Sequence, residues 1–442
     1  MKVSNWGNFP STEADVQSFS TSAEALQALG TATDFIPRGL GRCYGDSSLS
    51  SHIISTLKYN RFLEFDQGQG ILHCQSGLSF AEILDVIVPA GWFLPVTPGT
   101  KFVTVGGAIA ADVHGKNHHG EGSFSRHLLE FQLLAPSGLT YSCSRTENAD
   151  IFWATCGGMG LTGIILEARF KLKKIETAYI VEERSKAGNV DELYRLFEGS
   201  SNFTYSVAWI DSLAGGKSLG RGILLNGEHA SVGDLLEPKQ AQSPLALPRK
   251  GKLSIPFNLP SFTINPLTVK AFNTLYYSKA RRGQHRYVID YETYFYPLDG
   301  IYHWNRVYGR KGFAQYQFAM PPSTSYDGVV RILKAISQAR MPSFVSVLKT
   351  FGDCETGMIG FPMEGYMLAL DFPVTGFLFP FLDRLDEIVA ECGGRLYLTK
   401  DSRMKPEMFR QGYPRLQEFL GVKQKLDGGK HFQSLQSRRL GI

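Results

Sequence analysis

Apolar and polar side chains recur with two different spacings along the first 175 residues of this chain. Apolar residues three and four positions apart predict helices, whereas strict alternation predicts strands with one buried face. Residues 128–144 predict two strands joined by a turn at Pro136-Ser137-Gly138. Short elements of both kinds, mixed along the chain, predict an α+β fold. We expect helices at residues 21–30, 79–91 and the beginning of 149–175, and strands at 52–57, 61–66, 70–75, 92–96 and the end of 149–175.

The pattern changes after about Ile175. A chain of 442 residues is too long for one comfortable core, so we expect two domains. One is formed by residues 1–175 together with 395–442, and the other by residues 176–394. In the second part and the returning segment, we expect strands at 313–320, 343–352 and 366–374, amphipathic helices at 327–341 and 380–394, and a strand, a loop and a helix within 394–420.

The composition is that of an ordinary soluble globular protein, with 43% hydrophobic and 20% charged residues. The start, MKVSNWGNFPSTEADVQ, lacks the apolar core of a signal peptide, and no later apolar run is long enough to span a bilayer. The six cysteines are scattered without a CxxC pair, so they predict neither a zinc ribbon nor a disulfide framework. We therefore expect a cytoplasmic protein with reduced thiols.

Positive charge is concentrated in the segment 239–286, which holds nine lysines and arginines and no acidic residue. Apolar and aromatic residues alternate with these bases, and we expect Pro256, Pro260 and Pro266 to break any long helix. One interpretation is a solvated surface loop. The other is a lid that meets an anionic, apolar partner such as a lipid phosphate or the membrane surface. No nucleic acid is expected as a partner, because no recognisable binding module accompanies the basic residues.

Three histidines, His114, His118 and His119, lie within six residues. The spacing of the first two would place both imidazoles on one face of a helix, as in zinc enzymes. Nearby glycines disfavour that helix, and no glutamate stands beside His114 to act as a general base. We therefore predict no metal site. The pair Gly106-Gly107 just upstream indicates instead a chain that passes close to a large ligand.

Glycines cluster at three places in the first part of the chain: RGLGRCYGD from Arg38, PGTKFVTVGGAIAADVHG from Pro98 and CGGMGLTG from Cys156. None is a GxGxxG that opens a βαβ unit, so a nicotinamide site of Rossmann type is poorly supported. Backbone amides freed by glycines can nevertheless hold a pyrophosphate. Three clusters in order, the last followed by an alternating strand, are more specific than one.

At these residues the sequence resembles the vanillyl-alcohol oxidase type of FAD flavoproteins, in which comparable segments wrap one extended FAD. The strings GGAIAADVHGKNHH, FWATCGGMGLTGIIL, WNRVYG, QYQF and LTKDSR occur in this order over nearly the whole chain and narrow the resemblance to the decaprenylphosphoryl-β-D-ribose 2-oxidase family. HGKNHH together with KDSR is specific to that family. The FAD loops alone also fit alditol or sugar-lactone oxidases.

The resemblance implies a two-domain α+β fold. Residues 1–175 and 395–442 would form the FAD-binding domain, and residues 176–394 a substrate-binding domain with an antiparallel sheet, 239–286 being its lid. Relatives with covalent flavin often have a histidine where this chain has Arg42, so we predict noncovalent FAD. The residues that match the FAD loops are Gly39, Leu40, Gly41, Arg42, Cys43, Tyr44, Thr97, Pro98, Gly99, Thr100, Thr104, Gly107, Ala108, Gly158 and Gly163.

The same resemblance implies the active-site residues. His114 would lie near the flavin ring, and His118 and His119 are expected to be structural. The positions that match the substrate site are Lys116, Asn117, Gln315, Gln317 and Tyr397, with Lys400 and His114 as catalytic candidates.

Oxidation of a secondary alcohol requires a carbinol carbon held within about 3–3.5 Å of the hydride acceptor. The hydroxyl proton must leave at the same time, and a base or a polarising cation lowers the barrier. Lys400 with a lowered pKa could take this proton, or as a cation it could stabilise the alkoxide. The sequence does not choose between Lys400 and His114.

The implied reaction oxidises the 2-hydroxyl of polyprenylphosphoryl-β-D-ribose to a 2-keto sugar. A separate NAD(P)H-dependent short-chain reductase would then complete the epimerisation that provides the arabinose donor for cell-wall arabinan. A prenyl tail also implies peripheral association with the membrane surface. Two alternatives remain open: a soluble FAD-dependent alditol or sugar-lactone oxidase, and a non-catalytic binding protein of the same fold.

Overall fold

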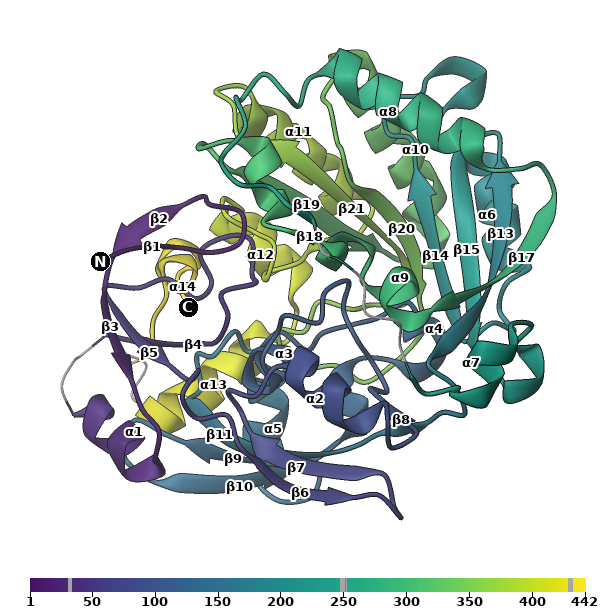
Figure 1. The fold of residues 1–442 in the computed structure, drawn as a ribbon. Helices are drawn as coiled ribbons and strands as arrows, with labels where there is room; N and C mark the ends of the chain where they lie inside the picture. Colours follow the sequence, from purple (N-terminus) through teal and green to yellow (C-terminus); the bar gives the residue numbers. More distant parts are fainter. Residues whose placement is uncertain (31–33, 247–250, 252, 428–431) are drawn as a thin grey trace.

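The computed structural model describes residues 1–30, 34–246, 251, 253–427 and 432–442. Within these residues the chain forms two larger β-sheets and several small ones, surrounded by helices (Figure 1). The fold is mixed α+β, which confirms the expectation from the sequence pattern.

The smaller of the two main sheets is built within the first 175 residues. Its strands lie in the order β10-β9-β11-β7-β6, and all neighbours are antiparallel. In β11 the alternating residues Ala168 and Phe170 are buried, whereas Lys171 is exposed, so the sequence pattern predicted this strand correctly. The strands are β6 (Phe62–Asp66), β7 (Ile71–Gln75), β9 (Leu128–Leu134), β10 (Thr140–Ser144) and β11 (Ile164–Lys171), and β9 with β10 forms the predicted hairpin.

Short helices pack around this sheet. One of them, α2 (Phe80–Ile87), begins with a reciprocal cap in which the Ser79 hydroxyl accepts from the Glu82 N–H and the Glu82 carboxylate accepts from the Ser79 N–H. The others in this part are α1 (Ser22–Leu29), α3 (Val105–Ala110), α4 (His118–Glu121) and α5 (Ala149–Thr155). The helices α1, α2 and α5 lie where the sequence predicted them.

Four minor sheets complete the strand pairing. Three parallel strands follow the order β3 (Asp15–Ser18), β5 (His52–Ser55) and β4 (Ile36–Arg38). The three two-stranded sheets pair β1 (Lys2–Ser4) with β2 (Ser11–Glu13), β8 (Trp92–Phe93) with β12 (Lys173–Lys174), and β16 (Leu253–Ser254) with β18 (Ile301–Tyr302).

The larger sheet has eight strands in the order β17-β13-β15-β14-β20-β21-β19-β22, and every pair is antiparallel (Figure 1). An antiparallel sheet in this part of the chain was expected. The strands are β13 (Tyr179–Ala187), β14 (Tyr205–Ile210), β15 (Gly222–His229), β17 (Gln284–Asp290), β19 (Phe313–Met320), β20 (Ser346–Phe351), β21 (Gly365–Pro373) and β22 (Arg395–Leu396).

Three amphipathic helices pack on this sheet: α6 (Val190–Glu198), α10 (Pro322–Ala339) and α11 (Leu378–Glu391). In α10, the buried residues Val329, Ile332 and Ile336 recur at helical spacing, which explains why this stretch forms a helix with one apolar face. Both α10 and α11 were predicted from their periodicity.

No helix of the described residues runs through Pro256, Pro260 or Pro266, as expected. Pro266 instead begins the 14-residue helix α8 (Pro266–Lys279), because the first turn of a helix needs no donor from this residue. Asn265 caps that helix by accepting from the Leu267 and Thr268 N–H groups. Near the end of the chain, the single helix that was expected is divided into α12 (Pro406–Gly412) and α13 (Leu416–Asp427), with Pro414 between them.

The basic segment 239–286 is therefore not one irregular loop. It contains the end of α7 (Pro238–Gln242), then β16, α8 and the start of the sheet strand β17. The helix α9 (Tyr291–Phe295) follows that strand. Three of the nine bases that were counted in the segment, Arg249, Lys250 and Lys252, lie outside the described residues.

One continuous hydrophobic cluster includes buried residues of both main sheets, among them Phe131, Phe170, Leu348 and Leu370. No helix in the described ranges is long and apolar enough to cross a membrane.

The C-terminal helix α14 (Leu435–Leu440) fastens two distant loops. The Arg439 guanidinium lies 2.8 Å from Asp46 Oδ1 and 2.8 Å from Asp401 Oδ2, and it also donates to the Met404 carbonyl. Both carboxylates are buried. The Asp401 carboxylate accepts the Arg403 N–H as well, so this ion cluster fixes the loop that follows β22.

We predict that Arg439→Met lowers the free energy of unfolding by about 3–5 kcal/mol, because two buried carboxylates lose their cation. The matched control is Arg438→Met. Its ion pair with Asp34 is partly exposed on both sides, and its loss should cost about 1 kcal/mol or less. Urea unfolding of both variants at neutral pH measures the difference. Equal losses in the free energy of unfolding would contradict a stabilising role of the Arg439 ion cluster.

Candidate functional site

The glycines of the first loop allow it to lie directly against the start of α3. A Cβ on Gly39 would stand 2.2 Å from Thr104 Oγ1, and one on Gly41, whose φ is +63°, would stand 2.0 Å from Arg38 Nη2. Thr104 caps α3 by accepting the Gly107 N–H over 3.2 Å. The first and second glycine clusters therefore meet at one helix N-terminus.

The third cluster joins the other end of the same helix. The Gly157 N–H donates to the Ile109 carbonyl at 3.0 Å, and the Met159 N–H donates to the Ala110 carbonyl at 2.9 Å. A Cβ on Gly158 would stand 2.1 Å from the Ala154 carbonyl oxygen. The structure thus brings all three predicted clusters together around α3, although contacts within the protein already account for the glycine at 158.

The loop from Thr97 to Thr100 is tied to the segment after β17 but leaves a glycine open. Thr97 Oγ1 lies 2.7 Å from the Tyr296 hydroxyl, and Thr100 donates to Asp299 over 2.8 Å. A Cβ on Gly99 would meet no described atom within 4 Å. This backbone is free to approach a large ligand.

His114 is buried and its Nε2 atom is engaged. The Gln317 amide lies 3.1 Å away and donates to Nε2, so the ring proton belongs on Nδ1. Nδ1 has no hydrogen-bond partner among the described residues. Burial holds the pKa of His114 well below its usual value, and the neighbouring Lys349, His118 and Lys400 act in the same direction. The imidazole is therefore neutral at pH 7.

The other two histidines of the cluster contact protein groups. His118 Nε2 lies 3.3 Å from Cys354 Sγ, and His119 Nε2 lies 2.8 Å from the Phe203 carbonyl oxygen. The helix α4 begins only at His118, so His114 and His118 do not share a helical face. No group of three potential metal ligands occurs in the part of the chain that the structure describes.

Lys116 and Asn117, which follow His114 in the sequence, also contact residues that surround the site. The Lys116 ammonium donates to the Tyr294 carbonyl and lies 3.9 Å from the centre of the Tyr294 ring. Burial and then the charge of Lys349 lower the pKa of Lys116 to about 7. The Asn117 amide donates to the Pro95 carbonyl over 2.8 Å, so this side chain holds the loop in place.

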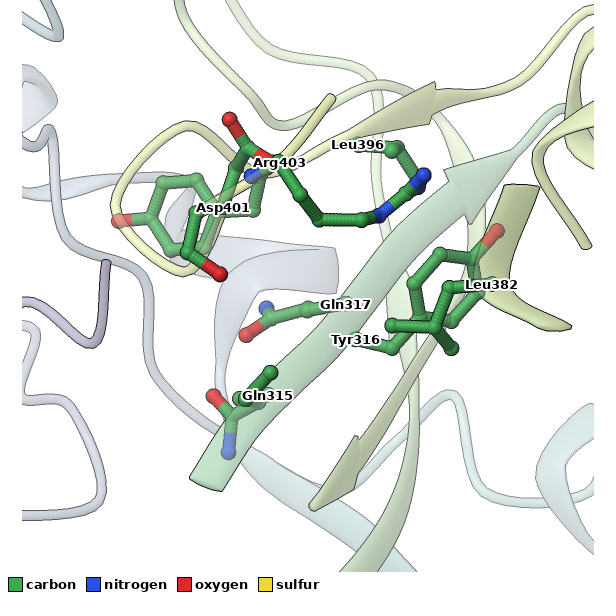
Figure 2. Close-up of a pocket in the computed structure, with 10 residues that line it drawn as sticks. Gln315, Tyr316, Gln317, Leu382, Leu396, Asp401 and Arg403 are labelled. Atoms are coloured by element: carbon green, nitrogen blue, oxygen red, sulfur yellow. The ribbon is translucent and has the colours of Figure 1, made fainter. Parts of the chain in front are cut away.

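Gln315 and Gln317 project from one side of β19, whereas Tyr316 and Leu382 lie on the other side (Figure 2). In the sheet, Gln315 pairs with Asp371 of β21 and Gln317 with Ala369. Val347 of the next strand pairs with Ala369, and Lys349 pairs with Met367. Paired residues of neighbouring strands point to the same face. These side chains therefore form one face of the sheet, which meets the His114 loop through Gln317.

A cavity of about 20 Å³ adjoins this strand and the loop after β22 (Figure 2). This is room for about one water molecule and far below the roughly 300–1,000 Å³ of most ligand pockets, so the cavity does not by itself hold a substrate. It is lined by Ala314, Gln315, Tyr316, Gln317, Leu382, Leu396, Tyr397, Asp401, Ser402 and Arg403.

Tyr397 connects this loop to the end of α3. Its hydroxyl donates to the Ala111 carbonyl over 2.9 Å, and its ring stacks on Phe361 at a centroid distance of 4.4 Å. Its hydroxyl is thus bound to the protein backbone, which makes Tyr397 part of the wall.

Lys400 follows on the same loop, and its Nζ lies 3.8 Å from the centre of the Tyr44 ring. Among the described residues, this amine has no hydrogen bond and no carboxylate within ion-pair distance. Burial lowers the pKa of Lys400 to about 8, an effect that Asp371 and Cys43 partly oppose. The amine is therefore available to a substrate and titrates close to neutral pH.

Lys349 is a site residue that the sequence reasoning missed. It lies on β20, and its charge lowers the pKa of His114, Lys116, His118 and Lys400. Burial lowers its own pKa to about 8. One signal was present in the sequence, because Lys349 lies between Val347 and Phe351 on a strand face that is otherwise apolar.

The sequence of residues 9–144 matches the FAD binding domain family. A decaprenylphosphoryl-beta-D-ribose oxidase of Mycolicibacterium smegmatis is 36% identical over 452 aligned residues, which cover 100% of this chain and 97% of that protein. An uncharacterized protein in the mprA 5′ region of Streptomyces coelicolor is 34% identical, over 83% of this chain and 100% of that protein. L-gulonolactone oxidase 3 of Arabidopsis thaliana is 27% identical, but over only 38% of this chain and 30% of that protein.

The donor set around α3 fits the cofactor of these proteins. Among the described residues, the backbone N–H groups of Gly39 and Gly41 have no protein acceptor and can hold a pyrophosphate, and Gly99 leaves backbone open to a ligand. FAD is thus the cofactor, and the protein is an FAD-dependent oxidoreductase. With similarity to the Mycolicibacterium protein over its full length, the chain belongs to the decaprenylphosphoryl-β-D-ribose oxidase family, whose FAD-binding fold is of the vanillyl-alcohol oxidase type.

Proposed function

We propose that this protein oxidises the 2-hydroxyl of a polyprenylphosphoryl-β-D-ribose to the 2-keto sugar. One observation of the site carries the proposal: Lys116, Lys349 and Lys400 converge on one region, each only partly buried and each with a lowered pKa. Such a concentration of cations fits a substrate that brings a negative phosphate. The name of the Mycolicibacterium relative supports the same substrate.

FAD, when bound, supplies the acceptor for the hydride that leaves the carbinol carbon. We propose that the residues matching the FAD loops hold it, from Gly39 to Tyr44, from Thr97 to Thr100, and at Thr104, Gly107, Ala108, Gly158 and Gly163. Residues 1–175 and 395–442 would form the FAD-binding domain, and residues 176–394 the substrate-binding domain.

We propose that the cofactor is held noncovalently. Arg42 stands where covalent relatives have a histidine, and its guanidinium lies 3.8 Å from the centre of the Trp6 ring. The Cys43 thiol lies 3.1 Å from the Ser48 hydroxyl, so it already has a partner in the protein.

Lys400 is the better base for the hydroxyl proton. Its amine is available, and with a pKa of about 8 roughly a tenth of it is unprotonated at pH 7. His114 accepts the Gln317 amide at Nε2, so the nitrogen that could accept a proton is occupied. Its Nδ1–H is left to donate to a ligand, which assigns His114 to orientation rather than to proton transfer. Gln315 and Gln317 then line the substrate side of β19.

The 2-keto product must be reduced from the opposite face of the sugar to complete an epimerisation. We propose that a separate NAD(P)H-dependent short-chain reductase performs this step, because the GxGxxG string of the chain, residues 158–163, lies between helix α5 and strand β11 and opens no βαβ unit for nicotinamide binding.

The basic segment 239–286 would hold the prenyl tail at the membrane surface. Four of its apolar residues are strongly exposed, with Leu253 at 72%, Phe257 at 63%, Phe262 at 76% and Leu267 at 80%. The cations Lys270, Lys279, Arg281 and Arg282 are exposed beside them. Exposed apolar residues among cations are suited to an anionic lipid surface.

We expect the protein to sediment with anionic vesicles more strongly than with neutral ones, and less strongly as salt is added, because the attraction to lipid phosphate is screened. Phe262→Ser combined with Leu267→Ser should weaken sedimentation. Phe377→Ser, which removes an exposed phenylalanine outside the segment, is the matched control. Equal effects of the two changes would refute a specific lipid-binding segment.

The substrate class can be tested by stopped-flow reduction of the flavin. We expect rapid bleaching with a short prenylphosphoryl ribose and little with alditols or sugar lactones, which lack the phosphate. Lys349→Met should weaken binding of the phosphorylated sugar about 10- to 100-fold, corresponding to a charge-assisted hydrogen bond of roughly 1.5–3 kcal/mol. Efficient turnover of an alditol would favour the soluble-oxidase alternative, and absence of bleaching with any sugar would favour a binding protein.

The proton acceptor can be tested by two substitutions. Lys400→Met keeps the length and apolar stem of the side chain but removes the amine, and should slow flavin reduction by about 10²- to 10⁴-fold while FAD stays bound. His114→Ala should cost less if the imidazole only orients the substrate. The same stopped-flow assay, with bound FAD measured by absorbance, compares them. A larger loss in His114→Ala would assign the proton to histidine.

A further inference from the structure

Asp371 is a buried carboxylate on the substrate face of the larger sheet, and no role described so far uses it. It is fully enclosed, and its Oδ1 accepts from the Gln315 amide. Its Oδ2 has no hydrogen-bond partner among the described residues. Burial raises the pKa of Asp371 to about 7, so the group is a carboxylate above that pH, and its buried charge then requires a cation nearby.

The Lys400 ammonium is that cation. The attraction between Asp371 and Lys400 opposes the effect of burial on the pKa of each group. Tyr44 lies between these groups in the site, since Lys400 Nζ stands over its ring and its hydroxyl faces Gln315 and Asp371. Asp371, Gln315, Tyr44 and Lys400 thus form one contiguous group.

The other groups around Asp371 and Lys400 are a lysine, a thiol, an imidazole and two tyrosine hydroxyls. Lys349 approaches Lys400 from β20 and disfavours its ammonium form, whereas Cys43 of the first loop favours it. Lys400 in turn disfavours a charge on His114. Tyr44 and Tyr308 face Asp371, and burial keeps the pKa of both hydroxyls well above the usual value. Among the residues of β19, β20 and β21 on this face, Asp371 is the one acid.

We propose that Asp371 is a positioning residue for the oxidation, which controls through its negative charge the protonation of the Lys400 amine. The inference rests on the proposed function in taking Lys400 as the proton acceptor. When the hydroxyl proton of the substrate passes to the Lys400 amine, an ammonium forms, and the carboxylate of Asp371 stabilises it.

A role in packing alone would not require a carboxylate. Asparagine has nearly the same size and its carbonyl could accept the same Gln315 hydrogen bond, so Asp371→Asn removes mainly the charge. Loss of the negative neighbour disfavours the ammonium form, and the pKa of Lys400 must fall. Opposite charges in close proximity shift a pKa by about 1–3 units, and we expect a fall of about 1 unit because the two groups do not form a direct ion pair.

The test measures Lys400 directly in the FAD-loaded protein. Competitive labelling with acetic anhydride across pH 6–10, read by mass spectrometry of the Lys400 peptide, gives the midpoint at which the amine becomes reactive. We expect this midpoint to fall by about 1 pH unit in Asp371→Asn. Lys349→Met should move it upward, because it removes a positive neighbour. An unchanged or raised midpoint in Asp371→Asn would overturn the inference.

Asp371→Ser provides a second variant if asparagine prevents folding, because serine also accepts a hydrogen bond without carrying charge, and the same fall in midpoint is expected. The pH dependence of flavin reduction separates this inference from the proposed function. A pH–rate profile whose limb moves with the labelling midpoint supports both. A midpoint that moves while the rate of flavin reduction has no such limb supports the control of Lys400 protonation by Asp371, but removes Lys400 as the base and with it the role of Asp371 in the oxidation.

Discussion

The pairing of β19 with β21, and of β21 with β20, determines which side chains face the loop that carries His114. In the observed register, Gln315, Gln317, Asp371 and Lys349 share one face. A slip of one residue would turn every side chain of a strand to the opposite face. The face would then present residues such as Phe318, Leu348 and Leu370, which are apolar, and no cation or carboxylate would remain.

The helices on the other side of the sheet stabilise this register. α10 and α11 pack against β19, and α10 also packs against β21. Leu348, Leu368 and Leu370 are fully buried on that side. Each such side chain contributes roughly 1.5–3 kcal/mol of apolar burial that a slipped strand would lose. Burial of the apolar face against the helices thus fixes the strand register, and the register determines which polar side chains share the opposite face.

Burial and, after it, crowding of cations govern the chemistry of the polar face. Burial lowers the pKa of Lys116, Lys349 and Lys400, and the charge of Lys349 lowers the pKa of Lys116, Lys400 and His114 further. The amines consequently titrate near neutral pH, where an unpaired surface lysine is almost entirely protonated. A negative substrate relieves this repulsion, so binding of substrate and proton affinity of the lysines are linked.

Local pattern was sufficient to predict most elements of the fold. The hairpin around Gly138, the capped helix after Ser79 and the strands β19 to β21 all follow from periodicity and turn residues. The helix α8 was not predicted, because a proline such as Pro266 has the same appearance in sequence whether it ends a helix or begins one.

The site residues that belong to a sequence motif, in the glycine loops and in KDSR, could be proposed from the sequence. The others depend on pairing between strands that are distant in sequence. Lys349 and Asp371 lie in different strands, 22 residues apart in sequence, and only the sheet register places them on one face with Gln315. A single lysine or aspartate within an apolar run gives no local sign of this arrangement.

The position of the C-terminal helix also has a consequence for the order of assembly. Arg439 of α14 binds Asp46, 393 residues earlier, while Tyr44 donates its backbone N–H to the carbonyl of Thr399. During synthesis the first glycine loop appears long before either partner, and contacts between such distant residues form slowly. The FAD loops therefore reach their final arrangement only after almost the whole sequence is available, and until then the apolar surfaces around them are open to chaperones and to aggregation.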